Sequence, residues 1–283
     1  MAKKLGLCMT GGGSRGAYQI GAAKALYDLG IFNEIKAFAG TSIGAANGAI
    51  LATRSIEKAK DVWFTLPEKN IPRNTHHTAS KGETRRRLLE IDRGIYSMDT
   101  FEDILIKGID FDTLQNREVY ATVSRGGKKD EGLLELVKAS YRHYVQKESK
   151  AIYLPLHELS KKQVVKSIIA SCSIPILFSP VTLDDFKYYD GGVFDNVPIK
   201  PLVDAGCDEI IILHLHKHYF YDPYEIAPDV KFHEVKHRGY LGGVLNFDYD
   251  HIMDLYQWGY ADCMAYFKNL EKESDETDAA FDD

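Results

Sequence analysis

The chain has 283 residues and a formal net charge of −6, from 35 lysines and arginines against 41 aspartates and glutamates. Its 45% hydrophobic and 27% charged content excludes wholesale disorder, and no apolar run reaches the ~18–20 residues of a membrane span. The tail at 271–283 holds seven acids and one base, so it carries the whole net charge and the rest is formally neutral. We therefore expect a folded domain over 1–270, a disordered acidic tail over 271–283, and no nucleic-acid partner.

The amino end and the cysteines indicate the compartment. Lys3-Lys4 precede an apolar stretch that glycines interrupt too early for a secretory signal. The four cysteines have no metal-binding spacing, so we expect free, buried thiols in a reducing, cytoplasmic setting. They are Cys8, Cys172, Cys207 and Cys263. No metal and no cofactor is expected.

The first fifty residues alternate between strand and helix patterns. Residues 4–9 and 35–39 are short apolar runs typical of buried strands. Residues 17–29 have helical apolar spacing that stops at Gly30, and 43–53 are rich in alanine. This β-α-β-α order with short connections predicts a three-layer α/β/α fold with a mainly parallel central sheet.

The rest of the chain continues the pattern after an interruption. Trp63 and Phe64 predict one further helical turn, and 67–93 is the candidate for a lid or surface excursion. The strands and helices predicted beyond it are strands at 119–123, 150–154, 186–189 and 209–215, and helices at 161–171 and 199–205.

A glycine-rich loop lies between the first strand and the first helix. Gly11, Gly13 and Gly16 fit the dinucleotide pattern G-x-G-x-x-G. That pattern needs an acidic residue at the end of the second strand, and 35–39 runs into Gly40 without one. The loop is better explained as a cradle of backbone N–H groups for a phosphate or an oxyanion. A tight turn with positive φ is the simpler alternative, but three successive glycines exceed what a turn requires.

Residues 40–44 form a second glycine motif. Gly40-Thr41-Ser42-Ile43-Gly44 fits G-x-S-x-G between an apolar strand and an alanine-rich helix. This context is typical of a nucleophile elbow, where flanking glycines permit a sharp turn beneath an exposed serine. Ser42 as a simple helix N-cap is the alternative.

A serine nucleophile requires a base. None of the ten histidines has a signature around it; His214, His216 and His218 alternate along a strand end, where a solvated face is favoured over a metal site. Asp190 is the better candidate, because Gly191-Gly192 after it let the backbone turn and the carboxylate project. An isolated D-G-G would otherwise be an ordinary turn.

Together these motifs resemble the patatin-like phospholipase family, in its bacterial type. The order G-G-G-x-R-G, G-x-S-x-G and D-G-G agrees, and the likeness extends over residues 4–267. Flanking segments also resemble the family, namely A-S-x-x-x-P at 170–175, N-x-P at 196–198 and G-Y-x-D at 259–262. Thr10 departs from the family's usual Asp or Gly.

The resemblance implies a serine lipid acyl hydrolase of phospholipase A or lysophospholipase type. Ser42 would be the nucleophile and Asp190 the general base of a Ser-Asp dyad, acting through an acyl-enzyme on a lipid or other acyl ester. The oxyanion hole would come from Gly11, Gly12, Gly13, Ser14, Arg15 and Gly16, chiefly through the backbone N–H groups of Gly12, Gly13 and Ser14. Arg15 would hold the loop or a substrate phosphate.

Two alternatives remain open. An acyltransferase shares the serine elbow, although Thr41 stands where those enzymes resemble G-H-S-x-G, and transfer of the acyl group to an alcohol shares the acyl-enzyme. A non-catalytic lipid-binding module is the second. Peripheral membrane contact is a subsidiary hypothesis, drawn from the basic run 85–87 and from the aromatic residues of 219–266, including Phe220, Phe232, Phe247 and Trp258. Packing of these aromatic residues against the last helices is favoured.

Overall fold

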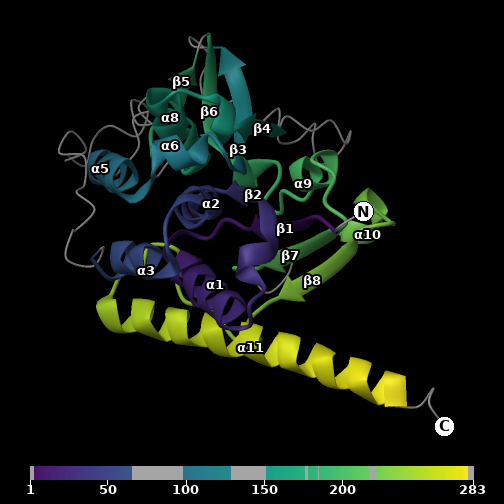
Figure 1. Cartoon of the computed structure of the whole chain (residues 1–283). Helices are drawn as coiled ribbons and strands as arrows, with labels where there is room; N and C mark the ends of the chain where they lie inside the picture. The colour runs from purple at the N-terminus through teal and green to yellow at the C-terminus, as the bar shows by residue number, and fades with distance from the viewer. Residues whose placement is uncertain are drawn as a thin grey trace.

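The computed structural model describes residues 3–65, 98–128, 151–175, 178–183, 185–216 and 221–279. The lid candidate at 67–93 and the run 85–87 within it, as well as His218 and Phe220, lie outside these residues. The described residues form one eight-stranded sheet of order β5-β6-β3-β2-β1-β7-β8, with β4 also pairing β3 (Figure 1). Its strands are β1 (Leu5–Met9), β2 (Ile35–Thr41), β3 (Glu118–Lys128), β4 (Ala151–Pro155), β5 (Val181–Leu183), β6 (Phe186–Asp190), β7 (Glu209–Leu213) and β8 (Lys231–Val235).

The sheet is mixed but mainly parallel. Adjacent strands β3, β2, β1, β7 and β8 all pair in parallel. Strands β4 and β6 run antiparallel to β3, and β5 runs antiparallel to β6. Parallel neighbours need crossover connections, and the helix between β1 and β2 supplies the first of them.

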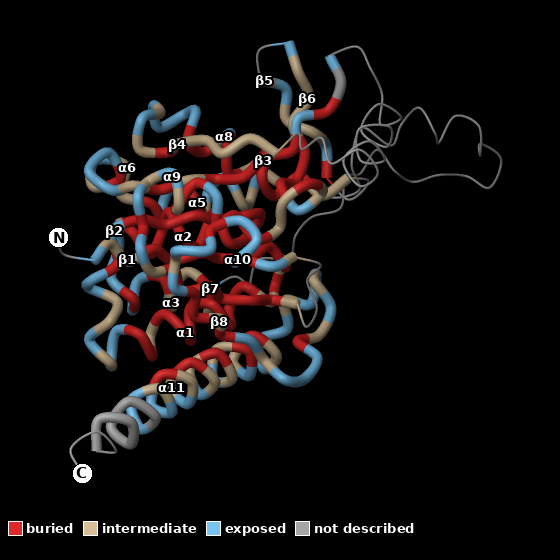
Figure 2. Tube along the Cα trace, turned by 90° about the vertical axis from the view of Figure 1, so that its right-hand side faces the viewer, coloured by how far each residue is buried: buried red, intermediate tan, exposed pale blue. Residues whose placement is uncertain are grey.

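Helices cover both faces of the sheet. They are α1 (Ala17–Asp28), α2 (Ile43–Thr53), α3 (Ile56–Thr65), α5 (Asp99–Gly108), α6 (Phe111–Leu114), α8 (Lys161–Ser171), α9 (Lys200–Asp204), α10 (Pro223–Ile226) and α11 (Tyr249–Ala279), with short 3₁₀ turns at Gly13–Gly16, Phe32–Glu34, Leu156–Glu158 and Gly191–Val193. Successive strand residues alternate between two cores: Leu7 and Met9 join the larger one with α1, α2 and α11, while Cys8 joins the smaller one beneath α9. Figure 2 shows the buried strands between these layers. The three-layer fold expected from the sequence is confirmed.

Several features differ from the sequence-based expectations. Strand β5 and helices α5, α6 and α10 were not predicted. Strand β8 was not predicted, because His233 and Glu234 give it a polar pattern; each pairs with a neighbouring strand, His233 with Glu209 and Glu234 with His214. Helix α11 continues through Ala279, so most of the segment expected to be disordered is helical. Glu, Lys and Ala favour helix, and elongation of a formed helix needs no new nucleation. Residues 280–283 lie outside the described part of the chain.

All four cysteines are free and buried, as expected. None of the helices in the described residues combines the length and the apolar character needed to cross a membrane.

Helix α11 passes beneath α1 at very short range (Figure 1). A Cβ on Gly21 of α1 would lie 1.9 Å from the Tyr256 carbonyl oxygen. A Cβ on Gly259 of α11 would lie 1.9 Å from the Tyr18 carbonyl oxygen. The glycine of the G-Y-x-D segment therefore permits this close crossing, and Asp262 of the same segment accepts a hydrogen bond from the Tyr18 hydroxyl at 3.0 Å.

Gly259→Ala is expected to destabilise the folded protein by about 1–3 kcal/mol, the usual cost of overpacking. The added methyl group meets backbone rather than a movable side chain, so the two helices must separate. Chemical denaturation of the variant measures this effect. Gly48→Ala in α2 is the matched control, because its Cβ would meet only the flexible end of Met9 at 3.0 Å; equal loss in both variants would contradict the close-crossing explanation.

Candidate active site

Ser42 stands at the sharp turn between β2 and α2. With φ of 56° and ψ of −126°, it is the one non-glycine residue with positive φ among the described residues. A Cβ on Gly40 would lie 2.2 Å from the Gly44 carbonyl, and one on Gly44 would lie 2.2 Å from the Met9 carbonyl oxygen. Both glycines are therefore required by the turn. A strained serine between such glycines is the geometry of a nucleophile elbow.

Strand β3 brings Asp190 to Ser42. Thr41, the last residue of β2, pairs with Thr122, and Asp190, the last residue of β6, pairs with the next residue, Val123. Strand β6 therefore lies along β3 beyond the end of β2, and the carboxyl ends of β2 and β6 meet. The Ser42 and Asp190 side chains are buried there, at 5% and 6% exposure.

The Asp190 carboxyl is held by one strong contact and is otherwise desolvated. Oδ1 accepts the Gly192 N–H at 2.8 Å, while Oδ2 is buried and meets no well-aligned donor among the described residues. Burial raises the pKa of Asp190 to about 6, against the lowering effects of the Ser42 hydroxyl and of the Gly192 N–H. The Ser42 hydroxyl is thus close enough to lower the pKa of this carboxyl, although no well-aligned hydrogen bond joins the two side chains. Catalytic hydrogen bonds of this kind often align fully only when substrate binds.

The end of α8 fixes both turns in place. The Ser42 N–H donates to Ser171 Oγ at 2.8 Å, and this hydroxyl donates in turn to the Thr122 carbonyl at 2.6 Å. The Asp190 N–H donates to the Ser173 carbonyl at 2.9 Å. The sequence motif marks Ser171 without giving its role; the structure shows that it ties the elbow to β3.

Two residues of the glycine loop are held by partners distant in sequence. The Gly11 N–H donates to Asn196 Oδ1 at 3.0 Å, which gives the asparagine of the N-x-P segment its role. The Ser14 N–H donates to the Val244 carbonyl at 2.8 Å. These two N–H groups are therefore occupied.

The N–H groups of Gly12 and Gly13 have no hydrogen-bond partner among the described residues. Both glycines line the same pocket as Ser42. Arg15 donates from Nε and Nη2 to the Gly242 carbonyl at 2.8 and 2.6 Å, and Gly16 packs on α2, so these two residues support the loop. Of the six residues predicted to form an oxyanion hole, Gly12 and Gly13 are therefore the two whose backbone N–H groups are free among the described residues and border the pocket at Ser42.

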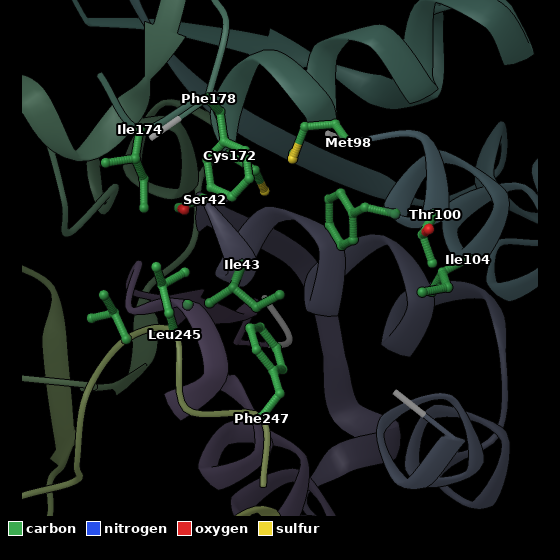
Figure 3. A pocket seen from close by; sticks show the side chains of 13 residues that line it. Ser42, Ile43, Met98, Thr100, Ile104, Cys172, Ile174, Phe178, Leu245 and Phe247 are labelled. Carbon is green, nitrogen blue, oxygen red and sulfur yellow. The ribbon is translucent and has the colours of Figure 1, made fainter. Parts of the chain in front are cut away.

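Two pockets meet at Ser42. The more polar of the two, which we call the vestibule, is lined by the glycine loop, Asp190, Gly192, Asn196 and His216, together with apolar side chains that include Ile174, Pro175 and Val193. The apolar one, which we call the chamber, encloses about 740 Å³ of empty space, partly open to solvent. The residues that line the chamber around Ser42 are Ile43, Met98, Thr100, Phe101, Ile104, Cys172, Ile174, Phe178, Val244, Leu245 and Phe247. In Figure 3 Ser42 lies at one side of the chamber, and Thr100 and Ile104 lie at the opposite side.

Sequence reasoning missed the chamber and misjudged the histidines at the end of β7. Phe101 and Ile104, one helical turn apart, are a signal for an apolar helix face, but nothing in the sequence places that face beside Ser42. His214 has a carboxylate partner after all, since its Nε2 lies 2.8 Å from Glu234. His216 lies in the vestibule, with Nδ1 3.1 Å from Arg15 Nη1. The described residues contain no group of three side chains suited to a metal ion.

Comparison with known proteins agrees with this geometry. A sequence model of the patatin-like phospholipase family matches residues 7–203. The chain belongs to the patatin-like phospholipase family. The match includes the glycine loop, the elbow and Asp190, while β7, β8 and α11 of this patatin-like phospholipase lie beyond it. No curated protein sequence matches the chain.

The chain is also similar to solved structures, at low sequence identity. The chain is similar to VipD from Legionella pneumophila, with a TM-score of 0.50 and 12% identity over 95% of this chain and 67% of that one. The chain is also similar to human GIVD cytosolic phospholipase A2 in complex with methyl gamma-linolenyl fluorophosphonate, with a TM-score of 0.40 and 12% identity. The comparison covers 95% of this chain and 58% of that one. For the type III effector protein ExoU, the TM-score is 0.37 and the identity 11%, over 95% of this chain and 53% of that one. The chain thus spans between about half and two thirds of the length of these proteins.

Proposed function

We propose that this patatin-like phospholipase is a lipid acyl hydrolase that works through a Ser42–Asp190 dyad and an acyl-enzyme. One observation carries the proposal: a strained serine next to a buried carboxylate stands where an apolar chamber meets a polar vestibule. An acyl ester with a long apolar chain and a polar alcohol fits this division, with the chain in the chamber and the alcohol in the vestibule.

In the first half-reaction Ser42 Oγ attacks the ester carbonyl while its proton passes to Asp190. The carbonyl π electrons move onto oxygen, and the N–H groups of Gly12 and Gly13 stabilise this oxyanion. When the tetrahedral intermediate collapses, the bond to the alcohol breaks and Asp190 returns the proton to the leaving oxygen. The acyl group remains on Ser42, and the free alcohol departs through the vestibule.

In the second half-reaction Asp190 takes a proton from water as the water attacks the acyl-enzyme. The same two N–H groups stabilise the second oxyanion. Collapse breaks the acyl–Ser42 bond, returns the proton to Oγ and releases a fatty acid. A carboxylate serves as base here because burial raises the pKa of Asp190 towards the working pH.

Contact with a lipid surface is part of the proposal. Tyr240 and Leu245 are 76% and 36% exposed on the segment between β8 and α11, and Tyr249, the first residue of α11, is 50% exposed. Leu245 lines the chamber together with Val244 and Phe247 of the same segment. Aromatic and apolar side chains around a pocket mouth suit a lipid–water interface. Other aromatic residues of this region pack inside the protein, since Phe232 is buried and Trp258 stacks on His237 at 5.0 Å.

Fatty acid release from a lipid panel tests the proposal, with wild type and Ser42→Ala compared by mass spectrometry. The panel contains phosphatidylcholine, lysophosphatidylcholine and triacylglycerol in vesicles or emulsions. We expect release by wild type, loss of release in the variant, and co-sedimentation of wild type with the vesicles. Equal release by both proteins would overturn the assignment of Ser42. Acylglycerol formed when glycerol is added would indicate acyl transfer, and failure of a fluorophosphonate to label folded protein would indicate a binding module.

The pH profile of a soluble ester substrate should follow Asp190. The base must be ionised, so kcat/KM is expected to fall about tenfold for each unit below a pH of about 6 and to level off above it. The sign follows from burial, which favours the protonated form and so delays ionisation. Steady-state kinetics in constant-ionic-strength buffers measures the profile; activity that is flat through this pH range would contradict a carboxylate base.

Ile104→Trp is expected to shorten the chamber. Ile104 lies at the side of the chamber opposite Ser42, so the indole ring of the variant would fill the space that the far end of a long acyl chain needs. Because each buried methylene contributes about 0.8 kcal/mol, turnover of palmitoyl esters should fall by at least about tenfold relative to butyryl esters. The ratio of kcat/KM for the two p-nitrophenyl esters measures this. Ile106→Trp on the same helix is the control, because Ile106 is 38% exposed. An unchanged ratio in Ile104→Trp would place the acyl chain elsewhere.

A further inference from the structure

The glycine loop packs against the end of β7. The family match ends at residue 203, so β7 and the residues that follow it lie beyond the match. Thr10 Oγ1 accepts the Leu215 N–H at 2.9 Å. A Cβ on Gly12 would lie 2.7 Å from Leu215 Cβ, so the loop is in direct contact with this segment. The residue that follows, His216, lines the vestibule with Gly11, Gly12 and Gly13.

Arg15 determines which ring nitrogen of His216 can accept a hydrogen bond. Arg15 Nη1 lies 3.1 Å from His216 Nδ1 and 3.2 Å from the Leu215 carbonyl. A guanidinium group only donates, so Nδ1 must be the acceptor and the neutral ring carries its proton on Nε2. Burial, and then the Arg15 charge, lower the pKa of His216 and keep the ring neutral.

The other contact of the ring is with the glycine loop itself. A hydrogen bond with the Gly11 backbone raises the pKa of His216, against the effects of burial and Arg15. Since Nδ1 faces Arg15 and the Gly11 N–H already donates to Asn196, the groups left to pair are His216 Nε2–H as donor and the Gly11 carbonyl as acceptor. The C=O and N–H groups of a trans peptide point in opposite directions. A Gly11 carbonyl that points toward His216 therefore leaves the Gly12 N–H pointing in the opposite direction, away from the His216 ring. The Gly11 N–H is fixed as well, by Asn196.

We propose that His216 is a positioning residue for the oxyanion hole: it takes a hydrogen bond from Arg15, gives one to the Gly11 carbonyl, and so fixes the Gly11–Gly12 peptide with its N–H aimed at the reacting carbonyl. The inference rests on the proposed hydrolase function. It adds a group from the end of β7 to the machinery and leaves His216 no direct part in proton transfer.

Substitutions at His216 test the proposal. His216→Leu removes both hydrogen bonds, whereas His216→Gln keeps an acceptor for Arg15 and a donor for Gly11. We expect His216→Leu to lower kcat on a soluble ester by about 10–100-fold with little change in KM, since a misaimed oxyanion donor affects the transition state alone. His216→Gln should recover most of the rate. Binding of a trifluoromethyl ketone, whose adduct carries the oxyanion, should weaken in step with kcat in His216→Leu.

Two further measurements separate this inference from the proposed function and from simple destabilisation. Crystal structures of the two variants are expected to show the Gly11–Gly12 peptide rotated in His216→Leu and retained in His216→Gln, whatever the activity. His157→Leu is the control for loss of a half-buried histidine, since His157 contacts the Val119 backbone at the opposite end of β3 and should leave kcat unchanged. An unrotated peptide in His216→Leu, or a rise in KM with kcat intact, would overturn the proposal. Wild type that neither turns over esters nor reacts with a fluorophosphonate would instead contradict the hydrolase function.

Discussion

Asp190→Asn is expected to lower kcat by about 10²–10⁴-fold and at the same time to stabilise the folded protein. The amide keeps an oxygen that can accept the Gly192 N–H, so the loop around Gly191 is retained. It cannot take the proton of Ser42, and both half-reactions lose their base. Steady-state kinetics on a soluble ester, with fluorophosphonate labelling of Ser42 as a second readout, measures the loss.

The gain in stability follows from the desolvated carboxylate. The pKa of Asp190 rises from 3.8 in the unfolded chain to about 6 in the folded protein, so the folded state binds more protons between these pH values and stability falls as pH rises through them. Above pH about 6 the full penalty applies, about 2–3 kcal/mol at ~1.4 kcal/mol per pKa unit.

Thermal unfolding of Asp190→Asn checks the sign of this effect. The variant should melt above wild type by several degrees, at ~2–4 °C per kcal/mol, in mildly alkaline buffer. The difference should shrink as pH falls through this range and vanish only below pH about 3, where Asp190 is protonated in both states. Asp204→Asn is the control, because Asp204 is an exposed residue paired only with Lys200. A variant that melts below wild type above pH 6 would show that the Asp190 charge stabilises the fold.

The sequence alone predicted those parts of the fold and of the candidate site whose structure depends on a local residue pattern or on local backbone sterics. The elbow was predictable because only glycines fit at 40 and 44, where added Cβ atoms would lie 2.2 Å from backbone. Short continuous apolar runs predicted the parallel strands other than β8, because those strands are buried on both faces. Strand β8 escaped because its polar residues satisfy one another across strands, a relation that a single sequence does not display.

The pairing of Ser42 with Asp190 depended on the family resemblance, and its physical reason lies in strand register. Thr122 and Val123 are neighbours in β3, and each holds the strand that carries one of the two side chains. No local pattern encodes such a register. The same holds for the segment 242–247, which closes the chamber and accepts the hydrogen bonds of Ser14 and Arg15. Its role arises only when the chain folds back on the glycine loop.

Among alanine substitutions in the glycine loop, Gly13→Ala is expected to lower activity the most. Gly13 has φ of 60°, and a Cβ there would lie 2.1 Å from the Val244 carbonyl oxygen. The alanine must either leave the left-handed region or displace Val244, which breaks the Ser14–Val244 hydrogen bond. Either change redirects the Gly13 N–H and moves the chamber wall. We expect kcat/KM to fall by about 10²–10³-fold, the loss typical of one oxyanion donor.

The chain supplies its own controls for the backbone strain in this variant. Gly30 and Gly206 have φ of 77° and 80°, yet a Cβ on either would meet nothing within 4 Å. Gly30→Ala and Gly206→Ala should therefore cost about 1 kcal/mol of stability, the strain of a left-handed alanine, with kcat/KM unchanged. Steady-state kinetics and chemical denaturation of the three variants separate strain from collision. Should Gly13→Ala lose only the stability that the controls lose and keep its activity, Gly13 would not be an oxyanion donor, and Gly12 alone would remain.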